Sequence, residues 1–320
     1  MKTKMKQMIL ASAMTLALGC SNNNSTDTSA KYNVGVIQLV QHPALDVATQ
    51  GFTDALQTEL GDDVNITVQV AAGDSSTCIT IANSYVSEGV DLIMANATPA
   101  LQAASSATSQ IPILGTSVTE YGTALSLKDF NGTVGGNISG TADLPPLEQQ
   151  AELFKELLPN AKNIGILYCS SEPNSVYQSN IVQKELEKLG YNVKVYTFSD
   201  SNDVSAVTQT VCQEVDAIYI PTDNTAASCA EAINNVAEPA GVPIIAGEEN
   251  MCKLCGIATL SIDYYELGQL TGKMAAEVLT GKKNISDMPI QYYENPVKKF
   301  DKERAEKLGI SIPSDYTEIQ

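Results

Sequence analysis

Short runs of apolar, mostly β-branched residues alternate with helix-like segments along almost the whole 320-residue chain. This alternation is typical of parallel strands joined by helical crossovers, because parallel neighbours need a long return connection. It predicts an α/β fold with strands over 34–40, 65–70, 90–94, 111–114, 164–168, 193–198, 217–220, 242–246 and 256–260. It predicts helices over 45–60, 75–87, 99–108, 145–158, 176–188, 204–213, 225–240, 264–280 and 301–308.

The order strand, polar loop, helix occurs in both halves of the chain, although no repeat is strict in sequence. Between the halves lies a glycine-rich stretch, Gly132–Gly140, with little apolar periodicity, which we interpret as a crossing between lobes. The length is sufficient for two domains with buried cores. The pattern therefore predicts two similar, doubly wound parallel-sheet lobes.

The N-terminal segment has the features of an export signal. Three lysines within the first six residues precede the apolar stretch Met8–Leu18, and Ala17-Leu18-Gly19-Cys20 places a small residue before a cysteine. The segment resembles a bacterial lipoprotein signal, in which the cysteine sulfur is diacylated and becomes the mature N-terminus. Ala17 stands where leucine is more usual.

We therefore expect residues 1–19 to be a removed signal peptide and residues 20–31 to be a flexible tether lipidated at Cys20. The alternative is an ordinary secretory signal with a coincidental cysteine. The apolar run, roughly 11 residues, falls short of the ~20 that a membrane-spanning helix needs. The expected location is outside the cytoplasm, anchored to the cell membrane.

Charge narrows the range of partners. The formal net charge is −18, and removal of residues 1–19 would leave 16 basic against 37 acidic residues, a net charge of −21. Such a surface repels phosphate backbones and anionic lipid headgroups. We therefore expect no nucleic-acid partner, and membrane attachment through the lipid alone.

Polar residues follow the predicted strands at their carboxyl ends, where open parallel sheets bind ligands. His42 follows the first strand, and Asn96-Ala97-Thr98-Pro99 follows the third. In the second half, Cys169–Ser175 and Pro221–Thr225 occupy the corresponding positions. Helix capping alone would also explain residues such as Thr98 and Asp223, and the residues by themselves leave both interpretations open.

Five segments carry a resemblance to a known family, in the order that the strand pattern predicts. They are Val36–Asp46, Ala97–Ala100, Glu172–Ser175, Pro221–Asn224 and Ile262–Tyr265. Over roughly residues 32–312 the chain resembles the ABC-transporter substrate-binding family, and within it the branch that takes up tryptophan and tyrosine. The resemblance implies the type I periplasmic-binding-protein fold, with two lobes, three hinge crossings and a solute held in the cleft.

On this basis we expect lobe I over 32–137 plus 249–288 and lobe II over 138–248 plus 289–320. The corresponding hinges would lie near Asn137–Thr141, Ala246–Glu249 and Asp287–Gln291.

A bound amino acid requires a cation site, an anion site and a side-chain pocket. We expect Asp223 to pair with the ammonium, with Asn224 or Glu172 as alternative acceptors, because a desolvated charge must be paired. Thr98 and Ser175 are the candidates for the carboxylate, together with nearby backbone N–H groups. The full predicted set is Gln38, His42, Thr98, Ser117, Thr119, Glu172, Asn174, Ser175, Thr222, Asp223, Asn224 and Tyr264.

The chain departs from the family pattern at two places. Thr119-Glu120-Tyr121 stands where an acidic residue followed by proline is usual, and Glu248–Cys255 contains a C-x-x-C sequence that the family usually lacks. Each could reshape the rim of the cleft.

Catalytic and metal-binding patterns are weak. Cys252 and Cys255 lack the thioredoxin-like context of a redox pair, and His42, the only histidine, has no partner pair with zinc spacing. The sequence contains no G-x-S-x-G, G-x-G-x-x-G or P-loop motif. We predict no metal, no cofactor and no catalytic residue. Six cysteines besides Cys20 allow 15 pairings, and we predict none of them.

The leading hypothesis is a lipid-anchored, extracytoplasmic substrate-binding protein that delivers an aromatic L-amino acid to an ABC permease and its ATPase. A sensory receptor with the same fold is the first alternative, and a surface enzyme is the second. The sequence disfavours the enzyme, because no nucleophile, base and orienting group can be assigned. It does not separate importer from sensor, since both need only a closing cleft.

Overall fold

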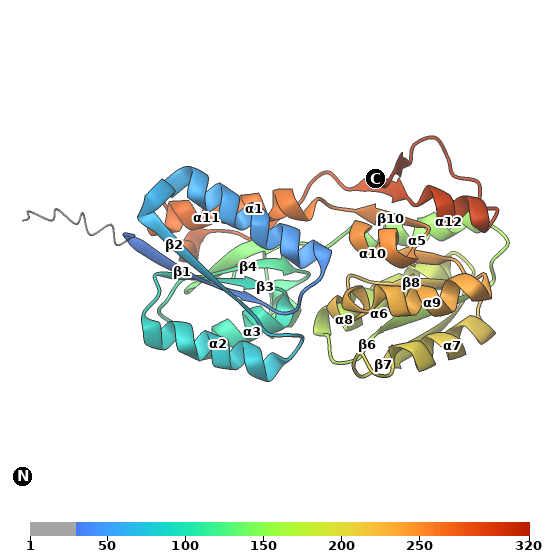
Figure 1. Ribbon diagram of the computed structural model, residues 1–320, viewed down its shortest axis with the longest axis horizontal. Coiled ribbons are helices and arrows are strands. Elements are labelled where there is room, and N and C mark those ends of the chain that lie inside the picture. The colour runs from blue at the N-terminus through green and yellow to red at the C-terminus, as the bar shows by residue number, and fades with distance from the viewer. Residues whose placement is uncertain (1–29) are drawn as a thin grey trace, which may run out of the picture.

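A computed structural model describes residues 30–320 and shows two α/β lobes side by side (Figure 1). The predicted signal peptide, Cys20 and most of the predicted tether lie outside the described residues. Within the described part, no helix combines the length and apolar character needed to cross a membrane.

The sheet of lobe I has six parallel strands in the order β11-β5-β4-β3-β1-β2. Apolar residues at both faces of its central strands form two cores, because helices cover both sides of the sheet. The strands are β1 (Tyr32–Gln38), β2 (Val64–Val70), β3 (Leu92–Asn96), β4 (Ile113–Val118), β5 (Ile138–Ala142) and β11 (Gln291–Tyr292).

Helices α1 (Pro43–Leu60) and α11 (Tyr264–Leu279) cover one face of this sheet, and α2 (Ser75–Glu88) and α3 (Thr98–Ala107) cover the other (Figure 1). Short helical turns lie at η1 (Gly61–Asp63), α4 (Tyr121–Ala124) and η2 (Ile285–Asp287). Glycines allow α1 and α11 to touch, because a Cβ added at Gly268 would overlap the backbone carbonyl of Ala48.

The sheet of lobe II has the order β13-β12-β10-β9-β8-β6-β7, and all neighbours are parallel except β10 and β12. Its first five strands in the chain repeat the order seen in lobe I, so the lobes share one winding. The strands are β6 (Asn163–Cys169), β7 (Asn192–Phe198), β8 (Ala217–Ile220), β9 (Ile244–Ala246), β10 (Ala258–Ser261), β12 (Val297–Phe300) and β13 (Thr317–Glu318).

Two layers of helices enclose this second sheet. One layer contains α5 (Leu147–Leu157) and α6 (Pro173–Lys188). The other contains α7 (Val204–Glu214), α8 (Asn224–Ser228), α9 (Ala230–Ala240) and α10 (Glu249–Cys255), with α12 (Lys302–Lys307) beyond them. The predicted fold class, two doubly wound lobes, is confirmed.

The expected lobe boundaries need correction, because strand pairing assigns three segments to the other lobe. Ile138–Ala142 pairs with β4 in lobe I, Ala258–Ser261 pairs with β9 in lobe II, and Gln291–Tyr292 pairs with β5 in lobe I. The chain therefore crosses at 143–146, 262–263 and 293–296, each time one strand later than expected. At the first crossing the prediction failed because it placed the glycine-rich stretch outside the sheet, whereas Gly140 lies inside β5.

Three local expectations also need correction. The helix expected over 225–240 is divided at Cys229 into α8 and α9. Helix α10 occupies a segment for which no element was predicted. Strand β12 also occupies a segment for which no element was predicted, because Val297–Phe300 pairs with β10, and the helix expected over 301–308 follows it as α12.

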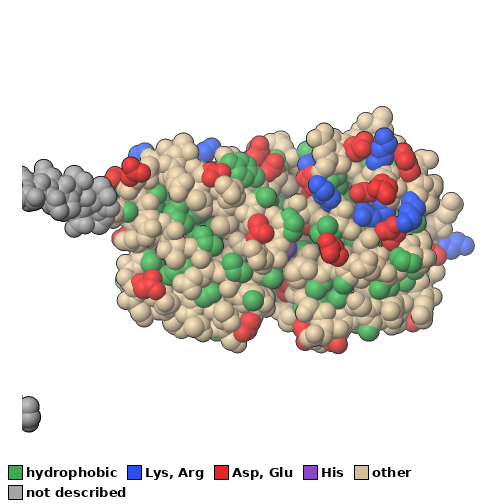
Figure 2. Space-filling view, viewed as in Figure 1, with side chains coloured by type: hydrophobic (Ala, Val, Ile, Leu, Met, Phe, Trp, Pro, Cys, Tyr) green, Lys and Arg blue, Asp and Glu red, His purple; other side chains and the backbone are tan. Residues whose placement is uncertain are grey.

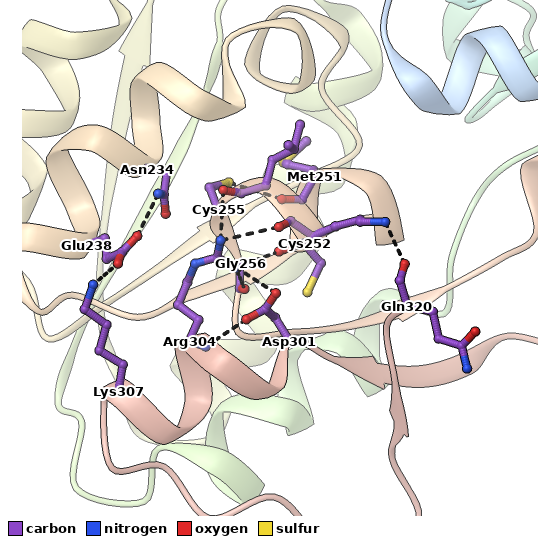
Figure 3. A network of polar contacts seen from close by, with 12 residues as sticks. Asn234, Glu238, Met251, Cys252, Cys255, Gly256, Asp301, Arg304, Lys307 and Gln320 are labelled. Atoms are coloured by element: carbon purple, nitrogen blue, oxygen red, sulfur yellow. Dashed lines mark hydrogen bonds and ion pairs between the residues drawn. The ribbon is translucent and has the colours of Figure 1, made fainter.

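A network of polar contacts holds α10 against the C-terminal segment (Figure 3). The Arg304 guanidinium donates to the backbone carbonyls of Cys252 and Gly256 at 3.2 and 2.8 Å, and to those of Lys253 and Leu254. These carbonyls lie at the end of the helix, where backbone acceptors run out of intrahelical donors, and that of Cys252 also accepts from the backbone N–H of Gly256. Cys252 and Cys255 are buried free thiols, and burial raises the pKa of Cys255 to about 12, so neither thiol is activated.

Candidate functional site

The strongest candidate site lies between the lobes, where the carboxyl ends of both sheets face each other. Both sheets reverse their winding between the first and third strands of the lobe, and this switch point is where open α/β sheets bind ligands. A narrow cavity occupies the position, and the space of about 290 Å³ between its lining atoms is partly open to solvent. Figure 2 shows the one histidine of the chain in the groove between the lobes.

Both lobes contribute to the wall of this cavity. Lobe I supplies residues from the loop before α1, from β4 and the loop after it, and from the start of α11, whereas lobe II supplies residues that begin α6, α8 and α10. The lining residues are His42, Ala44, Leu45, Ser117, Thr119, Asp143, Asn174, Thr222, Asp223, Asn224, Ala227, Glu248 and Tyr264.

The structure brings eight of the twelve predicted site residues to this wall. These are His42, Ser117, Thr119, Asn174, Thr222, Asp223, Asn224 and Tyr264.

The other four predicted residues, Gln38, Thr98, Glu172 and Ser175, are buried behind the wall. Gln38 is engaged within lobe I, since its amide donates to Asp46 at 2.6 Å and accepts from Thr49 at 2.7 Å. Thr98 is the first residue of α3. Ser175 and Glu172 support neighbouring side chains.

Two carboxyls that line the cavity were missed by the sequence analysis, Asp143 and Glu248. Asp143 directly follows β5, a segment that the sequence pattern indicated as a crossing, so its position at the end of a strand was not evident from the sequence. Glu248 caps α10 by accepting from the backbone N–H of Asn250 at 2.7 Å and from that of Met251. The available signal for both was an acidic residue within two positions of the end of a strand.

The carboxylate of Asp223, expected to meet the ammonium, already accepts three hydrogen bonds. Oδ2 accepts from the Ser175 hydroxyl at 2.6 Å and the Cys169 backbone N–H at 2.8 Å, and Oδ1 accepts from the Ala226 backbone N–H at 2.7 Å. Burial, and then the charge of Glu172, raise the pKa of Asp223 to about 7. This carboxyl is held chiefly by the interior of lobe II.

Asp143 is placed differently. Its Oδ2 accepts from the Tyr264 hydroxyl at 2.9 Å, while its buried Oδ1 has no partner among the described residues. Burial raises the pKa of Asp143 to about 6, against the opposite effect of the Tyr264 and Thr119 hydroxyls. An acid in this condition is ready to accept a cationic donor.

Unpartnered polar atoms concentrate at the cavity. Within residues 30–320, seven buried side-chain nitrogen or oxygen atoms lack a hydrogen-bond partner, and four of them belong to cavity residues. Since a buried polar group without a partner costs free energy, such a cluster indicates a place for a polar ligand. The four atoms are His42 Nδ1, Ser117 Oγ, Asp143 Oδ1 and Asn174 Oδ1.

Backbone geometry contributes to the same wall. Ser117 has a φ of 52°, and the pairing of β4 with β5 shifts register between Gly115 and Val118. Such an irregularity changes the direction of a side chain at the end of a strand. The non-glycine left-handed conformation is a cost that commonly occurs at binding sites.

The N-terminus of α1 opens onto the cavity at Ala44 and Leu45. His42 precedes Pro43 and makes no side-chain cap, so the backbone N–H groups of Ala44 and Leu45 have no partner within the helix. With the helix dipole, these groups suit a carboxylate. Among residues 30–320, no Lys or Arg lines the cavity, although three carboxyls, Asp143, Asp223 and Glu248, do.

This architecture defines a class of protein. Two similar lobes, three crossings and an enclosed polar cavity between opposing strand ends are the features of a solute-binding protein that closes around its ligand. Within the described residues no group of three or more His, Cys, Asp or Glu side chains could hold a metal ion.

The chain belongs to the ABC transporter substrate binding protein family, whose model matches residues 33–317. The fold is the type I periplasmic-binding-protein fold. Members of the family are extracytoplasmic solute-binding proteins that work with ABC transporter components and are not enzymes. The predicted family, fold and class of function are thus confirmed.

Two relatives are particularly informative. A tyrosine-binding protein of Clostridioides difficile is 37% identical over 301 residues, covering 90% of this chain and 87% of the relative. The crystal structure of an ABC domain from Streptococcus pneumoniae in complex with L-Trp is 34% identical, covers 91% of this chain and all of its own, and superposes with a TM-score of 0.87.

A third relative indicates the conformation. The ligand-free, open structure of a substrate binding protein with adhesive properties from Clostridium difficile is also 34% identical and covers 90% of this chain and 99% of its own, yet its TM-score is 0.69. Because identity and coverage equal those of the tryptophan complex, the lower score indicates a different arrangement of lobes. The lobes of this chain are therefore arranged as in the liganded relative.

Proposed function

We propose that this protein binds an aromatic L-amino acid in the cavity between its lobes and delivers it to an ABC importer. The observation that carries the proposal is the cluster of unpartnered buried acceptors in a cavity without a cationic side chain. Relatives that are a tyrosine-binding protein and a protein in complex with L-Trp support the aromatic class.

The ammonium group of the solute would pair with Asp143. This carboxyl has a free buried oxygen, whereas both oxygens of Asp223 are already engaged. Asn174 Oδ1 provides a second acceptor from lobe II, so an ammonium between them would connect the lobes. Asp143 thus replaces Asp223 as the proposed partner, and Asp223 remains in the site as a support for the loop before α8.

The carboxylate of the solute would lie at the N-terminus of α1. The backbone N–H groups of Ala44 and Leu45 and the hydroxyl of Ser117 are available there. The aromatic ring would fill the remaining space beside Tyr264 and Ala227.

Isothermal titration calorimetry with L-Trp, L-Tyr, L-Phe, L-Leu and L-Glu tests this assignment. We expect at least one of the aromatic amino acids to bind, with no binding of L-Glu, because the cavity presents carboxyls and no cation. The N-acetyl form of the best ligand is the matched control, and it should not bind, since acetylation removes the ammonium. If the wild-type protein shows no heat of binding with any of the three aromatic amino acids, the proposed ligand class is excluded.

We also propose that Cys20 carries the lipid anchor after removal of residues 1–19. The support is the sequence alone: the basic start, the apolar run and the small residue before the cysteine. Intact mass of protein extracted from membranes should show a diacylated mature chain that begins at Cys20. Secreted protein with a free Cys20 thiol would remove the anchor.

A further inference from the structure

We infer that Glu172 and Asn224 fix the tautomer of His42, so that its Nδ1 atom accepts a hydrogen bond from the side chain of the solute. The site would then favour tyrosine and tryptophan over phenylalanine. The inference rests on the proposed function, because it names the aromatic side chains that the cavity prefers. His42 is the residue that discriminates, and Glu172 and Asn224 act through it as positioning residues.

The starting point is a contact across the cleft. His42 Nε2 of lobe I lies 3.3 Å from Asn224 Oδ1 of lobe II. Within residues 30–320 it is the one side-chain hydrogen bond that joins the two lobes directly across the cavity, and none of the ion pairs does so. The orientation of the Asn224 amide therefore decides what His42 can do.

Glu172 determines that orientation. Its Oε2 accepts from the backbone N–H of Asn224 at 3.0 Å and from Asn224 Nδ2 at 2.7 Å. Its Oε1 accepts from the backbone N–H and the hydroxyl of Thr225, both at 2.7 Å. A carboxylate that meets backbone donors acts as an acceptor, so the amide nitrogen of Asn224 must face Glu172. The amide oxygen of Asn224 is then the atom that faces His42.

An amide oxygen only accepts, so His42 Nε2 must carry the hydrogen. Burial lowers the pKa of His42, against smaller opposite effects of Asn224, Glu172 and Asp46, so the imidazole is neutral. In a neutral imidazole with a hydrogen on Nε2, Nδ1 is a bare acceptor. This atom is buried and unpartnered, and His42 lines the cavity.

The charge of each acceptor in the cavity determines which hydrogen-bond donor of the solute it binds best. An ammonium is matched by the carboxylate of Asp143, because charge-assisted hydrogen bonds are the stronger ones. A neutral donor then remains for the neutral His42. Tyrosine offers a phenol O–H and tryptophan an indole N–H, whereas phenylalanine offers neither. A buried acceptor left without its partner weakens binding by about tenfold to a hundredfold.

The tautomer can be measured directly, because His42 is the only histidine. Long-range ¹H–¹⁵N correlation of protein labelled with [¹⁵N]histidine should show, at pH 7, a hydrogen on Nε2 and none on Nδ1. Asn224→Ala should weaken this preference. Asn234→Ala, the same substitution in α9 away from the cavity, should leave the spectrum unchanged. A hydrogen on Nδ1, or an imidazolium, in the wild-type protein would overturn the inference.

Calorimetry measures the consequence for binding. L-Tyr should bind at least about tenfold more tightly than L-Phe, and L-Trp at least about tenfold more tightly than its benzothienyl isostere, which replaces the indole N–H by sulfur. In His42→Leu both ratios should fall to within about threefold while L-Phe binds no more weakly than to the wild type. Equal wild-type affinities for L-Tyr and L-Phe would contradict the role of His42. Absence of all binding would instead refute the proposed function, whatever the tautomer.

Discussion

At the scale of single residues, the carboxyls of the site have two different roles. Two of them stabilise the fold, and one has an oxygen that is free to bind a ligand. Asp223 and Glu248 cap helices, and their acceptor oxygens are occupied. Asp143 keeps one buried oxygen free at the same wall. The chemical type of a residue does not distinguish these roles, and only the count of its partners does.

We expect Asp143→Asn to weaken aromatic amino-acid binding by roughly two to four decades, since a buried ammonium that loses its partner costs ~3–5 kcal/mol. Asp223→Asn is the matched control. Its new amide hydrogens would face the donors on Ser175 and Cys169, so we expect a loss of about 1–3 kcal/mol of unfolding free energy. Titration calorimetry and denaturant unfolding of both variants separate the roles. An unchanged affinity in Asp143→Asn would contradict the assignment.

The stability of the ligand-free protein should depend on pH through the same groups. Burial raises the pKa of Asp143 from 3.8 to about 6 and that of Glu248 from 4.5 to about 7. A folded state that holds protons more tightly than the unfolded state loses stability as pH rises through the folded pKa. These groups therefore make the ligand-free protein less stable between about pH 4 and 7.

For Asp143 this loss is about 3 kcal/mol at pH 8, because each pKa unit corresponds to about 1.4 kcal/mol. Asp143→Asn should remove the Asp143 share of the pH dependence, leave the share of Glu248 and Asp223, and stabilise the ligand-free protein at pH 8. Chemical denaturation at pH 5 and pH 8 measures both values. A variant that is less stable than the wild type at pH 8 would show that the charge of Asp143 does not destabilise the ligand-free protein.

The sequence predicts a site residue only where a local pattern marks its position. His42, Asn174 and Asp223 could be predicted to lie at the cavity because they follow recognisable strands. Asp143 was missed with its strand, and Gln38 was included although its amide serves the interior of lobe I. Partners distant in sequence decide such cases, and no local pattern records them.

At the scale of elements, the sequence predicted most strands and helices to within a few residues, because apolar periodicity and caps are local signals. Strand β5 was missed because its centre is Ser139-Gly140-Thr141, which carries little apolar signal. Gly140 is required there, since an added Cβ would overlap the carbonyl oxygen of Gly115 on β4. Pairing with neighbours, and not intrinsic preference, makes this segment a strand.

The contact between α1 and α11 should be sensitive to a single methyl group. Gly268→Ala would force the added Cβ into the Ala48 carbonyl, so the helices must separate, and we expect a loss of about 1–3 kcal/mol of unfolding free energy. Lys273→Ala on the exposed side of α11 is the control and should stay within about 0.5 kcal/mol of the parent. Urea denaturation distinguishes them. Equal stability of the two variants would mean that the helices pack less closely than described.

At the scale of the whole molecule, little holds the closed arrangement without a ligand. One side-chain hydrogen bond, between His42 and Asn224, crosses the cavity, and no ion pair among the described residues spans it. A single neutral hydrogen bond contributes about 1 kcal/mol. The lobes also pack through α4 against α6 and through α1 against α10, and we expect a ligand that satisfies the unpartnered cavity atoms to add to these contacts and favour closure.

We expect the ligand-free protein to open about the crossings at 143–146, 262–263 and 293–296 and to close when the solute binds. Small-angle scattering should show a smaller radius of gyration at saturating ligand. Asp143→Asn at the same ligand concentration serves as the control and should remain extended. A radius of gyration that is identical with and without bound ligand would describe a rigid binder.

The late position of α11 in the chain has a consequence for how the protein is made. A nascent chain emerges from its N-terminus, so β1–β5 and α1 appear first, yet the side of α1 that packs against α11 stays uncovered until residue 279 has followed. By then the five strands β6–β10 of lobe II have already emerged. Lobe I therefore stays incomplete while these strands of lobe II emerge, and a chain interrupted just before residue 264 would expose the α1 surface that α11 covers, an apolar surface of the kind that chaperones and proteases recognise.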